Sequence, residues 1–158
     1  MELQIRPAGI HDASLLATLN QYGQAPHVAA RPDIFKPTSH AELEAHYRAW
    51  LEQKTARGFI AELATEPVGY ARAVARETAE NPCCFARRWL ELDEIGVATH
   101  ARRRGVARAL IERVVAVADA EGFASVELGT WSFNTTAQAV FAKLGFSPQR
   151  LRLERRTR

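Results

Sequence analysis

The apolar residues at the start of the chain change from alternating to helical spacing. Residues 3–7 alternate apolar and polar side chains, as in a short strand. Asp12 can cap a helix whose apolar face ends near Tyr22 and Gly23. The segment Gly23–Thr38 is rich in Pro, Gly and His and shows no period, so it is expected to be a long loop that shapes a pocket.

A capping box begins a second helix. Ser39 is followed three residues later by Glu42, a spacing at which each side chain can bind the backbone N–H of the other residue. Leu43, Tyr47 and Trp50 then keep helical spacing. The remaining expected elements are strands Gly58–Ala64 and Val68–Arg76, a connection Glu77–Pro82, strand Trp89–Val97, helix Gly105–Glu121, strand Ala124–Thr130, helix Asn134–Leu144 and a last strand Phe146–Arg156.

This order of elements combines an antiparallel meander with helical crossovers. It predicts an α+β fold in which helices flank a mixed, largely antiparallel central sheet. The 158 residues suit one compact domain, residues 1–158, and show no internal repeat. No apolar run reaches the roughly 20 residues that a membrane span needs, and no secretory signal begins the chain, so we expect a cytoplasmic protein without a membrane partner.

The residue types that bind metals show no ligand spacing. The five histidines are not paired at helical spacing, and the only cysteines, Cys83 and Cys84, are adjacent and are expected to be free thiols. We therefore expect no metal site. The net charge of +3 does not by itself argue for nucleic acid binding.

The chain passes from the strand Trp89–Val97 into a helix through an arginine-rich turn. Arg102, Gly105 and Ala107 follow the pattern Arg/Gln, two residues, Gly, one residue, Gly/Ala. Gly105 places no side chain at the turn, and the N–H groups of Arg104 to Arg108 converge at the start of the helix. A helix start with free donors and nearby positive charge suits a phosphate, so a phosphate-bearing cofactor is the first hypothesis.

This turn resembles the pyrophosphate-binding signature of the GCN5-related N-acetyltransferase (GNAT) superfamily. The segment Asn134–Phe146, which begins 27 residues after Ala107, is similar to the second signature of that superfamily, in which the Asn contacts the pantetheine arm. Asn134 can equally be a helix N-cap, or do both. The resemblance implies that the strand before the turn splays from its neighbour around a bulge. It also implies an acetyl-CoA site at these splayed strands, formed by Ile95, Val97, Ala98, Arg102, Arg103, Arg104, Gly105, Val106, Ala107, Arg108, Asn134 and Phe141.

The strand before the turn holds three carboxylates. By alternation, Glu91 and Asp93 share one face and Glu94 takes the other. A carboxylate on this strand is the usual general base of the superfamily, because an alkylammonium must lose a proton before it attacks. Asp93 and Glu94 are the two candidates. The alternative is a solvated strand face or a salt bridge to the arginines.

The chain departs from the superfamily at Phe141, where a tyrosine commonly protonates the departing thiolate. Water, another group or one of Tyr22, Tyr47 and Tyr70 would have to replace it, or the thiolate would leave unprotonated. Five residues are candidates to line the acceptor pocket: His27, Phe35, His46, Trp131 and Phe133.

The leading hypothesis is an N-acetyltransferase that moves an acetyl group from acetyl-CoA to a primary amine by direct attack. A second is an acyl-CoA-binding module without turnover, and a third is a basic nucleic-acid-binding domain that uses Arg102–Arg108 and the arginines of the C-terminal segment. We rank them in this order and expect no nucleic acid partner. The resemblance also makes a homodimer a reasonable expectation.

Overall fold

The computed structural model describes residues 2–157 and contains one five-stranded sheet in the order β1-β2-β3-β4-β5. The first four strands are antiparallel neighbours, and β5 runs parallel to β4. Their bounds are Leu3–Pro7 (β1), Ala56–Leu63 (β2), Glu66–Thr78 (β3), Arg87–Val97 (β4) and Val126–Leu128 (β5). The prediction of an α+β fold with a mixed, largely antiparallel sheet is confirmed.

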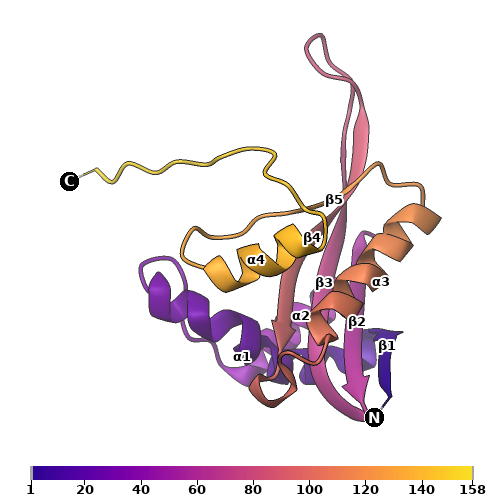
Figure 1. Ribbon diagram of the computed structural model, residues 1–158, viewed down its shortest axis with the longest axis vertical. Coiled ribbons are helices and arrows are strands. Elements are labelled where there is room, and N and C mark those ends of the chain that lie inside the picture. Colours follow the sequence, from indigo (N-terminus) through magenta and orange to yellow (C-terminus); the bar gives the residue numbers. More distant parts are fainter. Residues whose placement is uncertain (1, 158) are drawn as a thin grey trace.

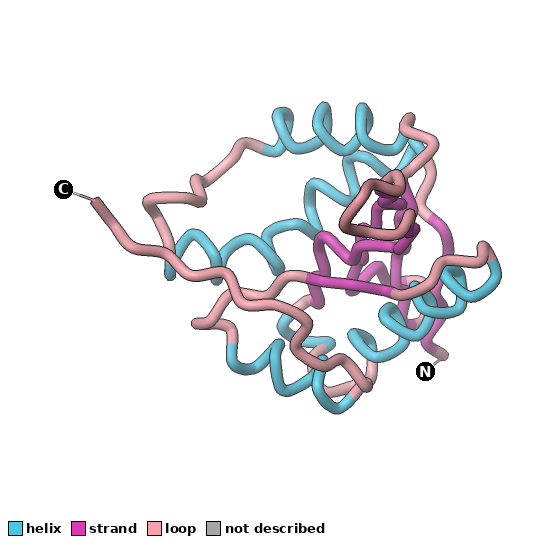
Figure 2. The backbone as a smooth tube through the Cα atoms, turned by 90° about the horizontal axis from the view of Figure 1, so that it is seen from above, coloured by secondary structure: helices cyan, strands magenta, loops and turns pink. Residues whose placement is uncertain are grey.

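Helices cover both faces of the sheet (Figures 1 and 2). Their bounds are Ala13–Ala30 (α1), His40–Leu51 (α2), Val106–Ala120 (α3) and Thr135–Lys143 (α4), with short 3-10 turns at Ile10–Asp12 and Thr99–Ala101. One hydrophobic cluster joins α1 and α2 to the sheet, and the other joins α3 and α4 to it. Successive side chains of a strand point to opposite faces of the sheet. Tyr70 and Val74 of β3 therefore belong to the first cluster, and Ala71 and Ala73 to the second.

Local signals in the sequence explain where α2 and α3 begin. The capping box is present, since the Glu42 N–H donates to Ser39 Oγ at 3.3 Å and the Ser39 N–H donates to Glu42 Oε2 at 3.1 Å. Val106, Leu110 and Val114 form the buried stripe of α3. Most other element boundaries lie within two residues of their predicted positions.

The prediction of a loop over Gly23–Thr38 is wrong in its first half. Helix α1 continues through Pro26 to Ala30. Gly23 does not end the helix but lets it approach β4, because a Cβ placed there would lie 3.1 Å from the Ile95 carbonyl oxygen and 3.0 Å from Tyr70 Oη. Packing against the sheet outweighs the backbone hydrogen bond that Pro26 cannot make.

The predicted last strand, Phe146–Arg156, is also absent from the described part of the chain. Residues 147–157 form an extended tail that leaves the body of the molecule after α4 (Figure 1). Leu151 and Leu153 alternate with arginines, as in a strand, yet they are 85% and 89% exposed. A strand needs backbone hydrogen bonds to a neighbouring strand. Residues 147–157 make none, and the contact of Gln149 with Glu127 of β5 joins two side chains.

The hairpin of β3 and β4 projects well beyond the helices, and Cys83 and Cys84 at its tip are free and exposed (Figure 1). Within residues 2–157, no helix is both long enough and apolar enough to cross a lipid bilayer.

Candidate functional site

The two parallel strands of the sheet separate after a short stretch of pairing. Strand β5 pairs with β4 only from Val126 to Leu128, opposite Leu90 to Leu92, whereas β4 continues to Val97. The last part of β4 therefore has a neighbouring strand only on the β3 side. Ile95 and Val97 are half-buried here, whereas the backbone of Ala98 is already paired, its N–H with Val68 and its C=O with Ala101.

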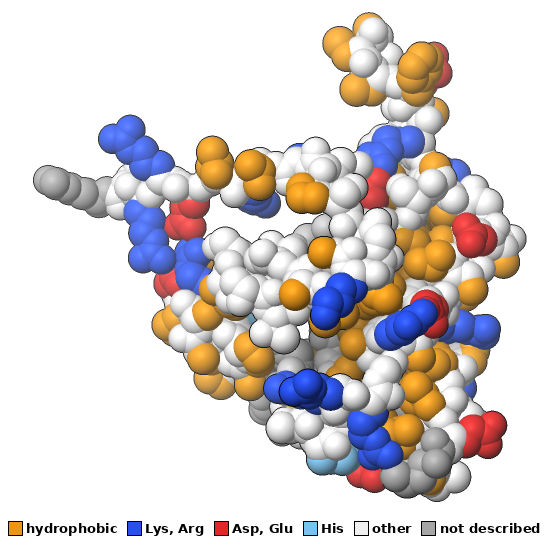
Figure 3. Space-filling view, in the orientation of Figure 1, with side chains coloured by type: hydrophobic (Ala, Val, Ile, Leu, Met, Phe, Trp, Pro, Cys, Tyr) orange, Lys and Arg blue, Asp and Glu red, His pale blue; other side chains and the backbone are white. Residues whose placement is uncertain are grey.

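The turn after β4 leaves the N-terminus of α3 open. Arg103 and Gly105 have positive φ angles of 61° and 81°, and Gly105 is the N-cap, so no side chain caps the helix. A Cβ placed on Gly105 would meet no atom within 4 Å. Figure 3 shows Lys and Arg side chains gathered around this part of the surface. Free N–H donors beside guanidinium groups form a surface that suits a phosphate.

The side chains of this turn divide into exposed and buried ones. The arginines Arg102, Arg103, Arg104 and Arg108 are exposed, Ala107 is half-buried, and Val106 is buried in the core. Arg102 Nε donates to the Val97 carbonyl at 3.4 Å, which ties the turn to the end of β4. Arg108 Nε pairs with Glu112 at 2.7 Å, whereas Arg103 and Arg104 have no ion-pair partner among residues 2–157 and can meet an anion. Val106 offers only its backbone.

Both candidate carboxylates of β4 lie on one face, contrary to the prediction from alternation. A register shift between Arg72 and Ala73 leaves Asp93 as an extra residue in β4, and this bulge cancels one step of the alternation. Arg72 consequently reaches both, with Nη1 3.1 Å from Glu94 Oε1 and Nη2 3.7 Å from Asp93 Oδ2.

Glu94 is held by hydroxyl groups as well as by Arg72. The Tyr47 hydroxyl donates to Glu94 Oε2 at 2.6 Å and the Tyr70 hydroxyl at 3.4 Å, while Asn20 Nδ2 donates to Tyr47 Oη at 2.8 Å. Burial, together with the nearby charge of Glu94, raises the pKa of both tyrosines. Tyr47 and Tyr70 therefore stay protonated and act as donors that fix the Glu94 carboxylate.

Asp93 has a different environment from Glu94. Burial raises the pKa of Asp93, although the positive charges of Arg72 and Arg76 oppose the shift. Its side chain borders a small pocket of about 170 Å³ between α2 and the strands β3 and β4. His46 lines the same pocket and accepts from Arg72 Nη1 at 2.8 Å. A carboxylate with a raised pKa beside a pocket is a plausible proton acceptor.

Four of the five predicted pocket residues come together at the end of α1. The rings of His27 and Phe35 have centroids 5.0 Å apart, His27 and Phe133 are 5.7 Å apart, and Phe35 and Trp131 are 5.4 Å apart. Trp131 and Phe133 belong to the loop that leaves β5, so the cluster spans the space between that loop and α1. His46 lies apart from them, beside Arg72.

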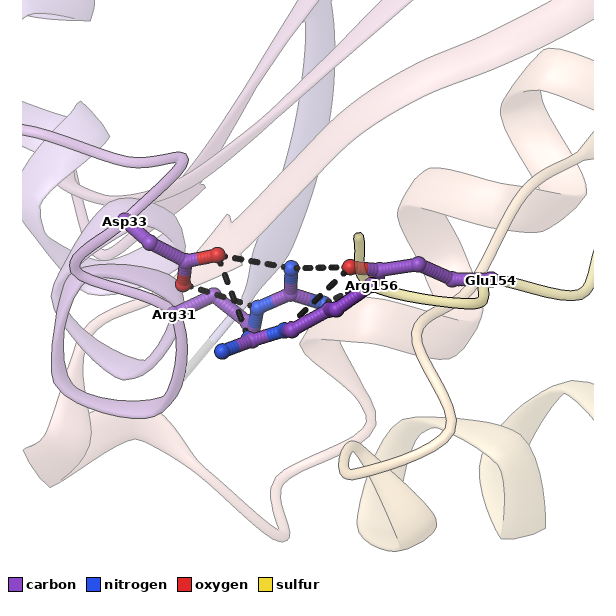
Figure 4. A network of polar contacts seen from close by, with 4 residues as sticks. All are labelled: Arg31, Asp33, Glu154 and Arg156. Carbon is purple, nitrogen blue, oxygen red and sulfur yellow. Dashed lines mark hydrogen bonds and ion pairs between the residues drawn. The ribbon is translucent and has the colours of Figure 1, made fainter. Parts of the chain in front are cut away.

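A polar network ties the tail to this aromatic cluster (Figure 4). Arg31, the residue that follows α1, pairs with Asp33 at 2.8 Å and with Glu154 of the tail at 3.1 Å, and Arg156 pairs with Asp33 at 3.3 Å. The hydrogen bond from Arg31 lowers the pKa of Asp33 to about 2. The guanidinium of Arg31 also lies 5.5 Å from the ring centroid of Trp131.

Helix α4 carries the two remaining predicted residues. Asn134 is its N-cap and accepts from the Ala137 N–H at 3.3 Å. Phe141 is 9% exposed, and its ring centroid lies 5.9 Å from that of Phe146 in the core. Asn134 thus acts as the helix N-cap, one of the two roles considered for it. Phe141 packs as a core residue and has no proton to give.

Comparison with protein families decides the relationship. The model of the Acetyltransferase (GNAT) family matches residues 26–146. The chain belongs to this family. A curated relative, an N-acetylaspartate synthetase of Danio rerio, is 29% identical over 109 residues, which cover 69% of this GNAT chain. The chain spans only about a third of that relative, because the match covers 35% of its length.

Solved structures share the fold of this GNAT domain. The BH1408 protein of Bacillus halodurans, solved as a tetramutant, superposes with a TM-score of 0.91 at 21% identity, over 98% of this chain and 99% of the other. An aminoglycoside N-acetyltransferase, AAC(6')-Iy in complex with CoA, gives 0.78 at 24% identity, over 99% and 95%. At these identities the likeness establishes the fold alone.

The sequence alone did not indicate two polar residues that shape the carboxylate site of the GNAT domain. Asn20 is 7% exposed on the buried face of α1, and Arg72 interrupts the otherwise apolar segment 67–75 of β3. A polar residue inside an apolar period was the signal that could have revealed them, since buried polar groups need partners. Within residues 2–157, no group of three or more His, Cys, Asp or Glu side chains is arranged to hold a metal.

Proposed function

We propose that this chain is an N-acetyltransferase that transfers the acetyl group of acetyl-CoA to a primary amine by direct attack. The observation that carries the proposal is the uncapped N-terminus of α3, which directly follows the part of β4 that β5 does not cover. The proposed donor site comprises Ile95, Val97, Arg102, Arg103, Arg104, Gly105, Val106, Ala107, Arg108 and Asn134. Ala98 and Phe141 are buried in the hydrophobic core and are not part of the proposed site.

The chemistry follows from this arrangement. The N–H groups at the start of α3 bind the pyrophosphate, and the last residues of β4 offer backbone groups to the pantetheine arm and to the thioester oxygen. The amine nitrogen attacks the thioester carbon, the C–N bond forms, and the C–S bond breaks. Asp93 or Glu94 accepts the proton that an alkylammonium must lose before the attack.

Thermal unfolding in the presence of acetyl-CoA tests the donor site. The wild-type midpoint should rise by several degrees at millimolar acetyl-CoA, because a ligand that binds only the native state stabilises it. Gly105→Glu should abolish the rise, since it places bulk and negative charge where the phosphates bind. If acetyl-CoA does not raise the unfolding midpoint of the wild type, the donor-site assignment is wrong.

Gly122→Glu is the matched control for Gly105→Glu. Gly122 lies just beyond the other end of α3, also has a positive φ (72°), and also has open space around its missing Cβ. Both substitutions therefore cost similar backbone strain, but only Gly105 lies at the proposed phosphate site. Equal loss of the acetyl-CoA response in both variants would attribute the effect to strain in α3.

A second candidate, an acyl-CoA-binding module without turnover, is favoured by one observation. Phe141 is packed in the core and has no proton to give to a departing thiolate. Release of free CoA thiol separates the two candidates, because only an enzyme releases it. The amine panel should include an aminoglycoside and aspartate, which represent the proteins similar to this chain, together with polyamines and peptides. Thiol release with at least one amine is expected, and a thermal response without release from any amine would favour the second candidate.

We also retain the homodimer as part of the proposal. Light scattering coupled to gel filtration measures it directly, and a mass near 17.6 kDa would show a monomer.

A further inference from the structure

We propose that His27 is the catalytic residue that delivers a proton to the departing CoA thiolate, the role left vacant by Phe141. This inference rests on the proposed acetyltransfer. It is carried by the position of His27, by the orientation of its ring and by the hydrogen bonds that already engage two of the tyrosines.

His27 faces the space where the thioester is expected. Residues four apart in a helix lie on the same face, and the residue one turn before His27 is Gly23. Gly23 lies against β4, since a Cβ placed there would be 3.1 Å from the Ile95 carbonyl oxygen. On the other side, the His27 ring packs edge-on against Phe133, in the loop that leaves β5. His27 therefore lies between the diverging ends of the two strands.

The ring orientation of His27 is fixed by a single hydrogen bond. Nδ1 lies 2.7 Å from the carbonyl oxygen of Gly23. A carbonyl only accepts, so Nδ1 carries a hydrogen and Nε2 is the nitrogen left for proton transfer. Within the described residues, Nε2 has no hydrogen-bond partner. The rings of Phe35 and Phe133 pack edge-on against the imidazole and hold it in this orientation.

The tyrosines of the chain are less suited to this role. The hydroxyl groups of Tyr47 and Tyr70 both donate to Glu94, and both rings belong to the buried cluster between α1, α2 and the sheet. Burial raises the pKa of each, but both protons are already engaged with the carboxylate. Tyr22 is half-buried and packs against both hydrophobic clusters. His27 alone among these side chains combines a free ring nitrogen with a place between the strand ends.

His27 accepts one proton and later donates it, so the transfer neither gains nor loses a proton at this residue. As the amine nitrogen bonds to the thioester carbon, it gains positive charge and gives one proton to Nε2. When the C–S bond breaks, the electron pair goes to sulfur and Nε2–H returns that proton to the thiolate. An acceptor that arrives as an ammonium has already passed its extra proton to Asp93 or Glu94. The products are the amide and CoA thiol, and His27 is neutral again.

The test compares His27→Gln and His27→Ala with His40→Gln, in which an exposed histidine of α2 is changed. We expect kcat of both His27 variants to fall about 100-fold, the scale of general acid–base catalysis. The KM for acetyl-CoA and the thermal response to acetyl-CoA should change little, which shows that the fold and the donor site remain intact. Imidazole should restore part of the activity of His27→Ala only, and His40→Gln should behave as the wild type.

Three other outcomes would each contradict the proposal, and each would point to a different cause. Activity of His27→Gln within threefold of the wild type removes His27 from catalysis and leaves the proposed acetyltransfer intact. A large loss with neither imidazole rescue nor a changed pH profile of kcat assigns His27 a structural role. If the wild type itself releases no CoA thiol with any amine, the proposed acetyltransfer fails, and the role of His27 fails with it.

Discussion

Asp93 and Glu94 of β4 both pair with Arg72, but their other neighbours differ. Glu94 accepts hydrogen bonds from two buried tyrosines, whereas Asp93 borders a pocket and has a raised pKa. Arg72 pairs with both and offsets part of their negative charge. Their chemical roles are therefore separable by substituting one at a time.

Replacing each carboxylate by its amide identifies the base. The variant that removes the base should lower kcat by about 10²-fold or more and alter the pH dependence of kcat, while the other should lose less than tenfold. Asp93→Asn and Glu94→Gln keep the size of each side chain, so packing changes little. Equal, mild effects from both would show that neither residue is the base.

Asp93→Asn also predicts a pH-dependent change in stability. The pKa of Asp93 is higher in the folded than in the unfolded chain, mainly because of burial, so ionisation opposes folding. The variant should therefore unfold at a slightly higher temperature at pH 7, by on the order of 1–2 °C. The gain should disappear as the pH falls below the unfolded pKa of about 4, where the carboxyl is protonated in both states. A variant less stable at pH 7 would mean that the Arg72 contact outweighs the cost of burial.

At the scale of elements, the sequence predicted those whose signals are local. The capping box at Ser39 and Glu42 and the apolar stripe of α3 are set by neighbouring residues, and both are present. The bulge at Asp93 is different, because it depends on the register between β4 and β3. Nothing in the spacing of β4 alone reveals that register, and for this reason the prediction that Glu94 takes the opposite face from Asp93 was wrong.

The end of helix α1 could not be predicted from local sequence signals either. Gly23 and Pro26 are strong local signals for the end of a helix, yet α1 passes through both. The packing of Gly23 against β4 and of His27 among aromatic rings extends the helix, and these contacts lie far apart in sequence. The extension brings His27 to the candidate site, so the functional interest of this segment was predicted but its conformation was not.

At the scale of the whole molecule, the domain divides into a packed body and an extended tail that exposed ion pairs join to it. The turn at Arg102–Arg108 and the N-cap Asn134 belong to the body, and the sequence motifs located them. The tail stands off from the body, and Figure 3 shows an opening beside it. Its alternating pattern predicted a strand, because a pattern reports what a segment can form and not whether a neighbouring strand is available.

Deleting residues 150–158 should therefore leave the stability of the body almost unchanged. The Arg31, Asp33, Glu154 and Arg156 network contains exposed pairs, and such pairs contribute about 0–1 kcal/mol each. We expect the unfolding midpoint of the truncated chain to stay within about 3 °C of that of the full chain, since 1 kcal/mol corresponds to roughly 2–4 °C at this size. Arg31→Gln, which breaks the same network but keeps the tail, is the matched control and should show a similar small change. A drop of more than about 5 °C on truncation alone, measured together with the mass in solution, would mean that Leu151 and Leu153 are covered in the native assembly.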